Sequence, residues 1–195
     1  GFISGSAILT GSSNVLLGSG AGGTTTAGGS LVIIGKGAGA ADMTSAANGT
    51  LAIGASAGAA LTTGAGNTAI GFEALKTNID GDFNTAIGYQ ALETFEADSD
   101  GHGKNTAVGY NAGQAVSTGT GNTIIGADAG DALVGGDDNT FIGTGAGGAT
   151  TAGGSIVAIG VGAGAGIMTS AADGTIVIGN SAGAAITTGA GNTAI

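Results

Sequence analysis

The sequence predicts an all-β fold, a parallel β-solenoid or β-roll of eleven coils of about 17 residues each, forming one domain over residues 1–195. Three observations predict it: an extreme composition, a strict internal repeat and a short strand motif within each repeat. Glycine supplies 45 of the 195 residues, proline and cysteine are absent, and 8% of residues are charged.

The composition excludes three other readings. Collagen needs glycine at every third position together with proline, and this chain has neither. A disordered linker is poor in aliphatic residues and rich in charge, whereas 42% of this chain is hydrophobic. A membrane span is excluded too, because no apolar run approaches ~20 residues. A stacked repeat remains.

The repeat is built on the motif Asn-Thr-Ala-Ile-Gly, clearest at 67–71 and 84–88, and present at 122–126 with Ile in place of Ala. Its aliphatic residue recurs every 17 residues, apart from two units of 19 and one of 21. A longer period lies above this one, because residues 14–70 match residues 139–195 at an offset of 125. Two nested registers indicate a real repeat rather than low complexity.

Each unit predicts a strand of about five residues around the aliphatic residue, since this region is β-branched and bounded by glycine. The aliphatic residue and the residue two before it share one face, which we expect to point into the coil. The residue between them points the other way and is never charged. We therefore expect this second face to be buried against another subunit.

The remaining columns predict the rest of the coil. The short unit suits two strands and two tight turns, with glycine supplying positive φ angles. A column of alanine, seen in ten of eleven units, fits where walls are too close for larger side chains. A column of asparagine is expected to stack as a ladder of side-chain amides. It comprises Asn14, Asn67, Asn84, Asn105, Asn122, Asn139 and Asn192.

The net charge and the scarcity of titratable side chains argue against two classes of function, nucleic-acid binding and enzymatic catalysis. The formal net charge of −10 repels phosphate backbones, so we expect no nucleic-acid partner. The chain has a single histidine, His102, and lacks cysteine and arginine, which leaves few groups for acid–base or nucleophilic chemistry. We therefore expect a protein that is not an enzyme, and one that does not insert into a membrane.

The units at 67–75 and 84–92, both of the form Asn-Thr-Ala-Ile-Gly-x-x-Ala-Leu, resemble repeats of phage tail fibres and bacterial surface proteins. They are also similar to the head repeats of trimeric autotransporter adhesins. The resemblance implies an extracellular β-roll that forms a homotrimer through its inner strands. The 17-residue period departs from the shorter adhesin repeat.

A candidate site lies between residues 72 and 110, where acidic and aromatic residues concentrate and where the longest unit enlarges a turn. The acidic spacing in two consecutive turns is that of oxygen ligands for calcium. Stacking would place the two turns side by side, and a cation would relieve their repulsion. The alternative is a pair of solvated Asx turns. The candidate ligands are Asp80, Asp82, Glu96, Asp98 and Asp100.

Two functional hypotheses follow. The first is a structural, extracellular fibre whose copies assemble side by side and end to end, and the chain is expected to be a segment of a longer array. Residue 195 followed by residues 1 and 2 would recreate the repeat motif. The second is an adhesin or phage receptor-binding module, with residues 72–110 contacting a surface glycan or a protein receptor.

Overall fold

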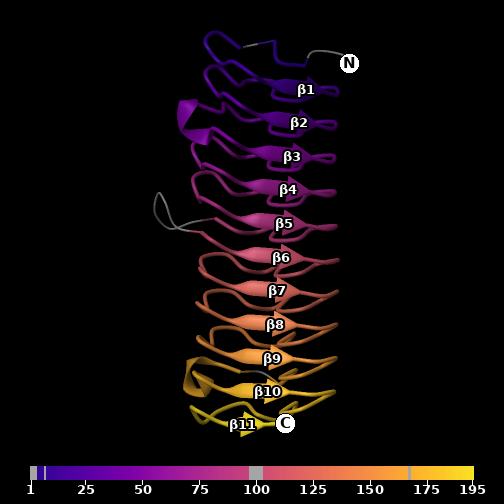
Figure 1. Ribbon diagram of the computed structural model, residues 1–195, viewed down its shortest axis with the longest axis vertical. Coiled ribbons are helices and arrows are strands. Elements are labelled where there is room, and N and C mark those ends of the chain that lie inside the picture. Colours follow the sequence, from indigo (N-terminus) through magenta and orange to yellow (C-terminus); the bar gives the residue numbers. More distant parts are fainter. Residues whose placement is uncertain (1–3, 7, 97–102, 167) are drawn as a thin grey trace.

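The computed structural model shows a rod of stacked coils whose strands lie directly above one another (Figure 1). It describes residues 4–6, 8–96, 103–166 and 168–195. Within these residues the strands form one parallel sheet of 11 strands, in the order in which they occur in the chain. The predicted all-β solenoid with coils of about 17 residues is confirmed.

Each strand is only three residues long, except the last, which has two. The strands are β1 Val15–Leu17, β2 Val32–Ile34, β3 Leu51–Ile53, β4 Thr68–Ile70, β5 Thr85–Ile87, β6 Thr106–Val108, β7 Thr123–Ile125, β8 Thr140–Ile142, β9 Val157–Ile159, β10 Ile176–Ile178 and β11 Thr193–Ala194. Equivalent residues pair throughout, even across the longer units, as in Thr85 with Thr106. Two 3₁₀ turns, η1 Ser45–Ala47 and η2 Ser170–Ala172, lie in the two 19-residue units.

The prediction of two strands per coil is wrong, because the return half of each described coil consists of turns. The coils are still hydrogen-bonded there, as in Gly58 N–H to Ala74 O at 2.9 Å and Leu75 N–H to Ala91 O at 3.0 Å. The residues flanking the buried alanine have positive φ, for example Glu73 at 55° and Leu75 at 51°. A chain with this alternating conformation cannot form a regular β-ladder.

The predicted orientation of the strand faces is also wrong. The middle residue of the strands β2 to β10 points into the coil and is at most 1% exposed, whether it is Ala69, Ile124 or Phe141. The first and third residues point outward and are partly or largely exposed. The coil is narrow: alanine is the commonest middle residue, and Phe141 fits only against glycines, since a Cβ atom on Gly130 or Gly147 would lie 2.8 Å from its ring. The longer aliphatic column therefore faces outward.

Most of the core of the described residues lies in three columns, of which the sequence pattern revealed only the alanine column as a place of close packing. The middle strand residues form the second. The third lies on the return wall and is buried at 0% exposure: Thr25, Met43, Leu61, Asn78, Phe95, Val116, Leu133, Thr150 and Met168. The sequence does not reveal the return-wall column, because a column that mixes Thr, Asn, Phe and Met shows no recurring residue type.

The glycine that follows each strand is required by its backbone and by its neighbour. Gly126 has a φ of +137°, which L side chains rarely adopt. A Cβ atom added there would lie 2.6 Å from the carbonyl carbon of Gly143 in the next coil. The glycine column therefore lets the coils approach at the spacing of a parallel sheet, about 4.8 Å.

The predicted asparagine ladder is confirmed over five consecutive coils. The side-chain amide of each asparagine donates to Oδ1 of the one before it, from Asn84 to Asn67 at 3.1 Å through to Asn139 to Asn122 at 3.0 Å. Each Oδ1 also accepts the backbone N–H of the next asparagine, as in Asn105 N–H to Asn84 at 3.1 Å. The ladder satisfies buried polar groups along one inner edge of the sheet.

No helix within the residues that the structure describes is long and apolar enough to cross a membrane.

Candidate functional site

Three aromatic rings form a ladder at the C-terminal ends of strands β4, β5 and β6. Phe72, Tyr89 and Tyr110 each lie two residues after the strand, directly after the glycine column. The rings of Phe72 and Tyr89 are 5.1 Å apart and nearly parallel, and those of Tyr89 and Tyr110 are 5.3 Å apart. The three residues remain 43–52% exposed. Parallel stacking means that Tyr89 directs both ring faces at its neighbours and only its edge at solvent.

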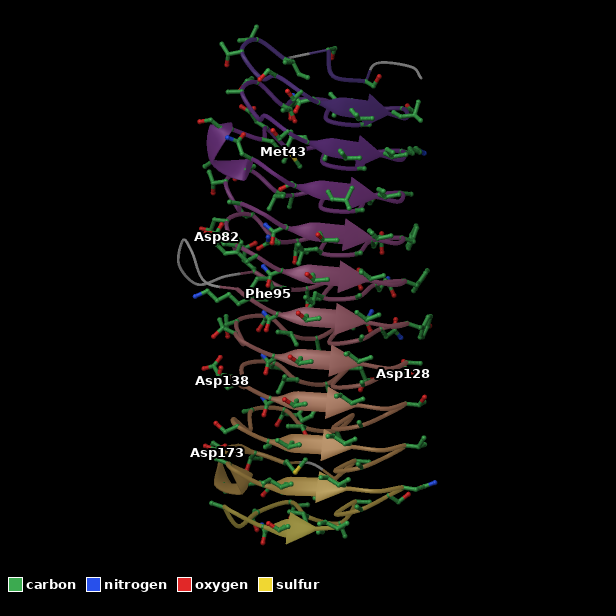
Figure 2. The ribbon with its side chains drawn as sticks, in the orientation of Figure 1. Met43, Asp82, Phe95, Asp128, Asp138 and Asp173 are labelled. Atoms are coloured by element: carbon green, nitrogen blue, oxygen red, sulfur yellow. The ribbon has the colours of Figure 1, made fainter. Side chains whose placement is uncertain are left out.

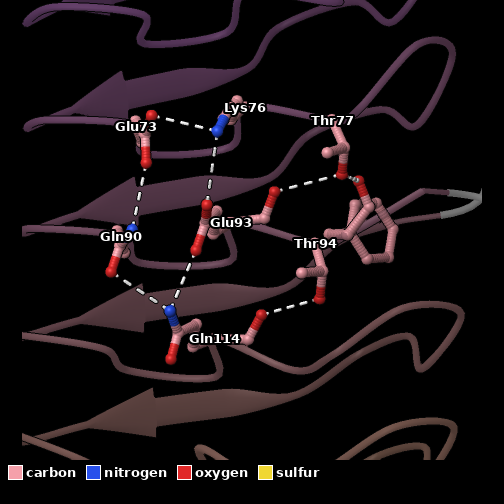
Figure 3. A network of polar contacts seen from close by, with 8 residues as sticks. Glu73, Lys76, Thr77, Gln90, Glu93, Thr94 and Gln114 are labelled. Atoms are coloured by element: carbon pink, nitrogen blue, oxygen red, sulfur yellow. Dashed lines mark hydrogen bonds and ion pairs between the residues drawn. The ribbon is translucent and has the colours of Figure 1, made fainter.

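Figure 3 shows a closed polar network, in which Glu73 and Gln90 directly follow Phe72 and Tyr89 of the ladder in the chain. Lys76 Nζ lies 2.9 Å from Glu73 Oε1 and 3.5 Å from Glu93 Oε1. Gln90 donates to Glu73 at 3.0 Å, while Gln114 donates to Gln90 at 3.1 Å and to Glu93 at 2.9 Å. The five side chains thus form a ring of contacts across three coils.

The network uses side chains in a column of the repeat that carries glycine in several other coils. Glu73 and Gln90 belong to this column and have φ angles of 55° and 54°. A side chain in that conformation costs about 1–2 kcal/mol. The hydrogen bond from Gln90, followed by that from Lys76, lowers the pKa of Glu73. The bond to Glu73 raises the pKa of Lys76.

Two threonines attach the network to the return wall. Thr77 Oγ1 donates to the carbonyl oxygens of Glu93 and Phe95, both at 3.0 Å. Thr94 Oγ1 donates to the carbonyl of Gln114 at 2.7 Å. These contacts cross from one coil to the next, so they fix the spacing of the coils that carry the aromatic ladder.

The aromatic residues of the 72–110 zone do not form one surface. Phe95 is fully buried in the return-wall column, so it contributes to the core. Phe83 lies two residues before β5, at the opposite ends of the strands from the ladder, and is 59% exposed. These residues are close in sequence, but the coil places them at both ends of the strands and on the return wall.

The candidate calcium ligands are placed only in part, because Asp98 and Asp100 lie outside the described residues. Asp82 Oδ1 accepts the backbone N–H of Ala65 at 2.6 Å. Three other side chains in the same column of the repeat do the same for the coil before them: Asn48, Asp137 and Asp173. Asp82 and Asp173 lie along one edge of the rod (Figure 2). Asp82 therefore serves as a backbone cap.

Asp80 and Glu96 interact with each other across two coils. Burial, together with the nearby charge of Asp80, raises the pKa of Glu96, although its Oε2 accepts the N–H of Ile79 at 3.0 Å. Asp80 Oδ1 is buried and finds no hydrogen-bond partner among the described residues. Within those residues, no group of three acidic or histidine side chains could hold a metal ion. The five-ligand calcium site remains an untested prediction.

The outward sheet face carries no charged residue from β1 to β10. Its two columns, the first and third strand residues, contain only Thr, Val, Leu and Ile from β1 to β10. Val15, Leu17, Ile125, Ile176 and Ile178 are exposed there. A chain with a net charge of −10 thus keeps its charges on the turns and away from this face.

Comparisons with known proteins found no match for this chain, whether among family models, curated proteins or solved structures. The parallel β-solenoid is consistent with the β-roll that the repeat motif implies.

Proposed function

We propose that the chain is a structural, fibre-forming repeat protein that acts outside the cell. The observation that carries the proposal is the uncharged, β-branched outward sheet face. An exposed face that is rich in aliphatic residues and carries no charge is suited to protein–protein contact, and a sheet buried on both faces reads as continuously apolar. The proposed partner is another copy of the chain, packed side by side, and the motif resemblance favours a homotrimer.

The fold suits the shaft of a fibre, because the hydrogen bonds between successive coils all run along the long axis of the rod. Every strand pairs with the next, and the return wall adds further backbone hydrogen bonds between coils. Eleven coils at one strand spacing each give a rod of roughly 50 Å. Further coils would extend such a rod without a change of geometry, so we also propose end-to-end stacking.

The test places a charge on the sheet face. Ile125 is 39% exposed, so Ile125→Lys can keep its ammonium group in solvent in a single chain and still fold. In an assembly the charge would be buried, and association should fall below detection in sedimentation velocity. The matched control is Val134→Lys, at a 48% exposed position on the return half of the next coil. Equal assembly of both variants, or a monomeric wild-type chain, would contradict the proposal.

The receptor-binding alternative is favoured by one observation, the partly exposed aromatic ladder beside a polar network. A glycan or protein receptor would contact Tyr89 and Tyr110. Substituting both by alanine should then abolish receptor binding while the fibre persists, as seen by electron microscopy together with a glycan-array measurement.

A further inference from the structure

We propose that neighbouring copies of the chain run parallel, and that Phe83 and Lys104 of one copy pack against the aromatic ladder of the next. The inference rests on the side-by-side assembly proposed above. It adds the relative direction of neighbouring copies and the residues that determine this direction.

The outward sheet face has two rims, one at each end of the strands. We call the residues two before each strand the N-terminal rim and those two after it the C-terminal rim. Asp138 marks the N-terminal rim in Figure 2, and Asp128 lies just beyond the C-terminal rim. From β4 to β8 the N-terminal rim is Gly66, Phe83, Lys104, Gly121 and Asp138. The C-terminal rim over the same strands is Phe72, Tyr89, Tyr110, Ala127 and Thr144.

Symmetry decides which rims meet. When two copies face each other and are related by rotation about the long axis of the rod, the N-terminal rim of one copy meets the C-terminal rim of the other at the same level. A closed ring of three parallel copies brings the same two rims together. Parallel assembly thus joins unlike rims, whether two or three chains take part.

The unlike rims are chemically complementary at β4 to β6. Phe83 leans over Gly66, since a Cβ atom on that glycine would lie 2.8 Å from its ring. This places Phe83 level with Phe72 and Tyr89, where aromatic rings can pack edge to face. Lys104 is exposed and lies at the level of Tyr110, where an ammonium group gains a cation–π contact. The exposed ring edges of the ladder acquire partners in this way.

Antiparallel assembly brings like rims together in reversed order. With β1 opposite β11, the strand β6 lies opposite itself, so Lys104 of one copy meets Lys104 of the other. Like charges opposed at an interface are unfavourable. Phe83 then meets Gly121 and Tyr89 meets Ala127, so both lose their aromatic partners, and the one aromatic pair left on these rims is Tyr110 with its own copy. Charge and aromatic packing both favour the parallel arrangement.

The polarity can be measured by cross-linking, because the chain contains no cysteine. Single-cysteine chains Val157→Cys, Ile159→Cys and Leu51→Cys leave both rims unchanged. Parallel packing places position 157 of one copy beside position 159 of the next. Antiparallel packing places position 157 beside position 51. With a short bis-maleimide, the mixture of V157C and I159C should form cross-linked chains, whereas the mixture of V157C and L51C should not.

The role of the rims is tested by charge reversal. Lys104→Glu removes the cation–π contact, and we expect association to weaken by about two- to thirtyfold for each such contact. Lys36→Glu is the matched control, because it makes the same charge change on the C-terminal rim after β2, where the facing residue is Ser30. Sedimentation equilibrium measures both, and circular dichroism checks the fold.

The outcomes separate the two proposals. A wild-type chain that stays monomeric at all concentrations would overturn the proposed assembly itself. A wild-type chain that assembles but yields the V157C–L51C product would overturn only the parallel polarity. Equal weakening by Lys104→Glu and Lys36→Glu would show that net charge, and not the rim contact, governs association. It would leave the aromatic ladder free for a receptor.

Discussion

Asn122 links two coils through both ends of its carboxamide: its Nδ2 donates to Asn105 Oδ1 at 3.1 Å, and its Oδ1 accepts the backbone N–H of Asn139 at 3.0 Å. Asn122 is fully buried. A single side chain therefore satisfies polar groups on both neighbouring coils, and the ladder makes the coils interdependent.

Asn122→Ala is expected to destabilise the rod by at least about 2 kcal/mol. The substitution removes the partners of the backbone N–H of Asn139 and of the buried carbonyl oxygen of Gly136, and each unsatisfied buried group costs about 1–3 kcal/mol. Urea unfolding followed by circular dichroism measures the change. The control is Asn180→Ala at an exposed position, which should change stability by less than about 0.5 kcal/mol. Equal effects would mean that the ladder contributes little.

Gly126→Ala should destabilise the fold far more than Gly145→Ala. Both residues have positive φ, at +137° and +64°. At Gly145 nothing lies within 4 Å of an added Cβ, so only the conformational cost of about 1–2 kcal/mol applies. At Gly126 the Cβ would collide with the backbone of Gly143, so we expect a loss above about 4 kcal/mol. Similar thermal unfolding midpoints for the two variants would refute the close-approach argument.

Two buried threonines should respond to valine in opposite ways. Thr150 Oγ1 is buried without a hydrogen-bond partner among the described residues, so Thr150→Val removes an unsatisfied hydroxyl and should stabilise by about 1 kcal/mol. Thr50 Oγ1 donates to Ala47 O at 3.0 Å, so Thr50→Val orphans that carbonyl and should destabilise by a similar amount. Differential scanning calorimetry compares the pair. A change of the same sign in both would contradict this assignment.

Asp131 should make the fold more stable as the pH falls. Burial, and then the charge of Asp128, raises the pKa of Asp131 above its ordinary value of 3.8. A carboxyl with a raised folded-state pKa destabilises the fold above that pKa, and the penalty disappears as the pH falls below the unfolded value. Asp131→Asn should therefore raise stability at neutral pH and flatten this part of the pH profile. An unchanged profile in urea titrations at stepwise lower pH would refute the prediction.

The calcium hypothesis predicts that a chelator lowers the melting temperature of the wild-type chain. Asp82→Asn separates ligation from capping, because Asn48 accepts a backbone N–H in the same column at 2.7 Å. The variant should keep the cap and its stability in chelator, yet lose any stabilisation by added calcium. A melting temperature that is insensitive to chelator would end the hypothesis.

The sequence could predict the features that follow from the repeat length. The offsets between equivalent residues define the coil, and coils of nearly constant length can stack only with equivalent residues paired, as Ile70 pairs with Ile87. The asparagine ladder followed from the same logic. The return-wall column, with Leu61 beside Asn78 and Phe95, could not be predicted, because side chains of different chemical types are buried at this position.

The candidate site shows the same division. The cluster of aromatic and acidic residues was visible in the sequence, but its three-dimensional order was not. Tyr89 joins a ladder, Phe95 enters the core and Phe83 moves to the other rim, because a coil sends residues a few positions apart to different walls. Asp82 became a cap because the turn of the preceding coil presents a backbone N–H to it.

By itself, the sequence determined the parallel solenoid, its repeat length and its close coil contacts, since glycine, alanine and asparagine recur in register. Only the tertiary structure decided which strand face lies inside. Alternation defines two faces but does not rank them when both are apolar. The inner column is mostly alanine, such as Ala86, whereas the longer Ile87 beside it points outward, so the more hydrophobic column faces outward. That reversal leaves an apolar, uncharged surface on the single chain.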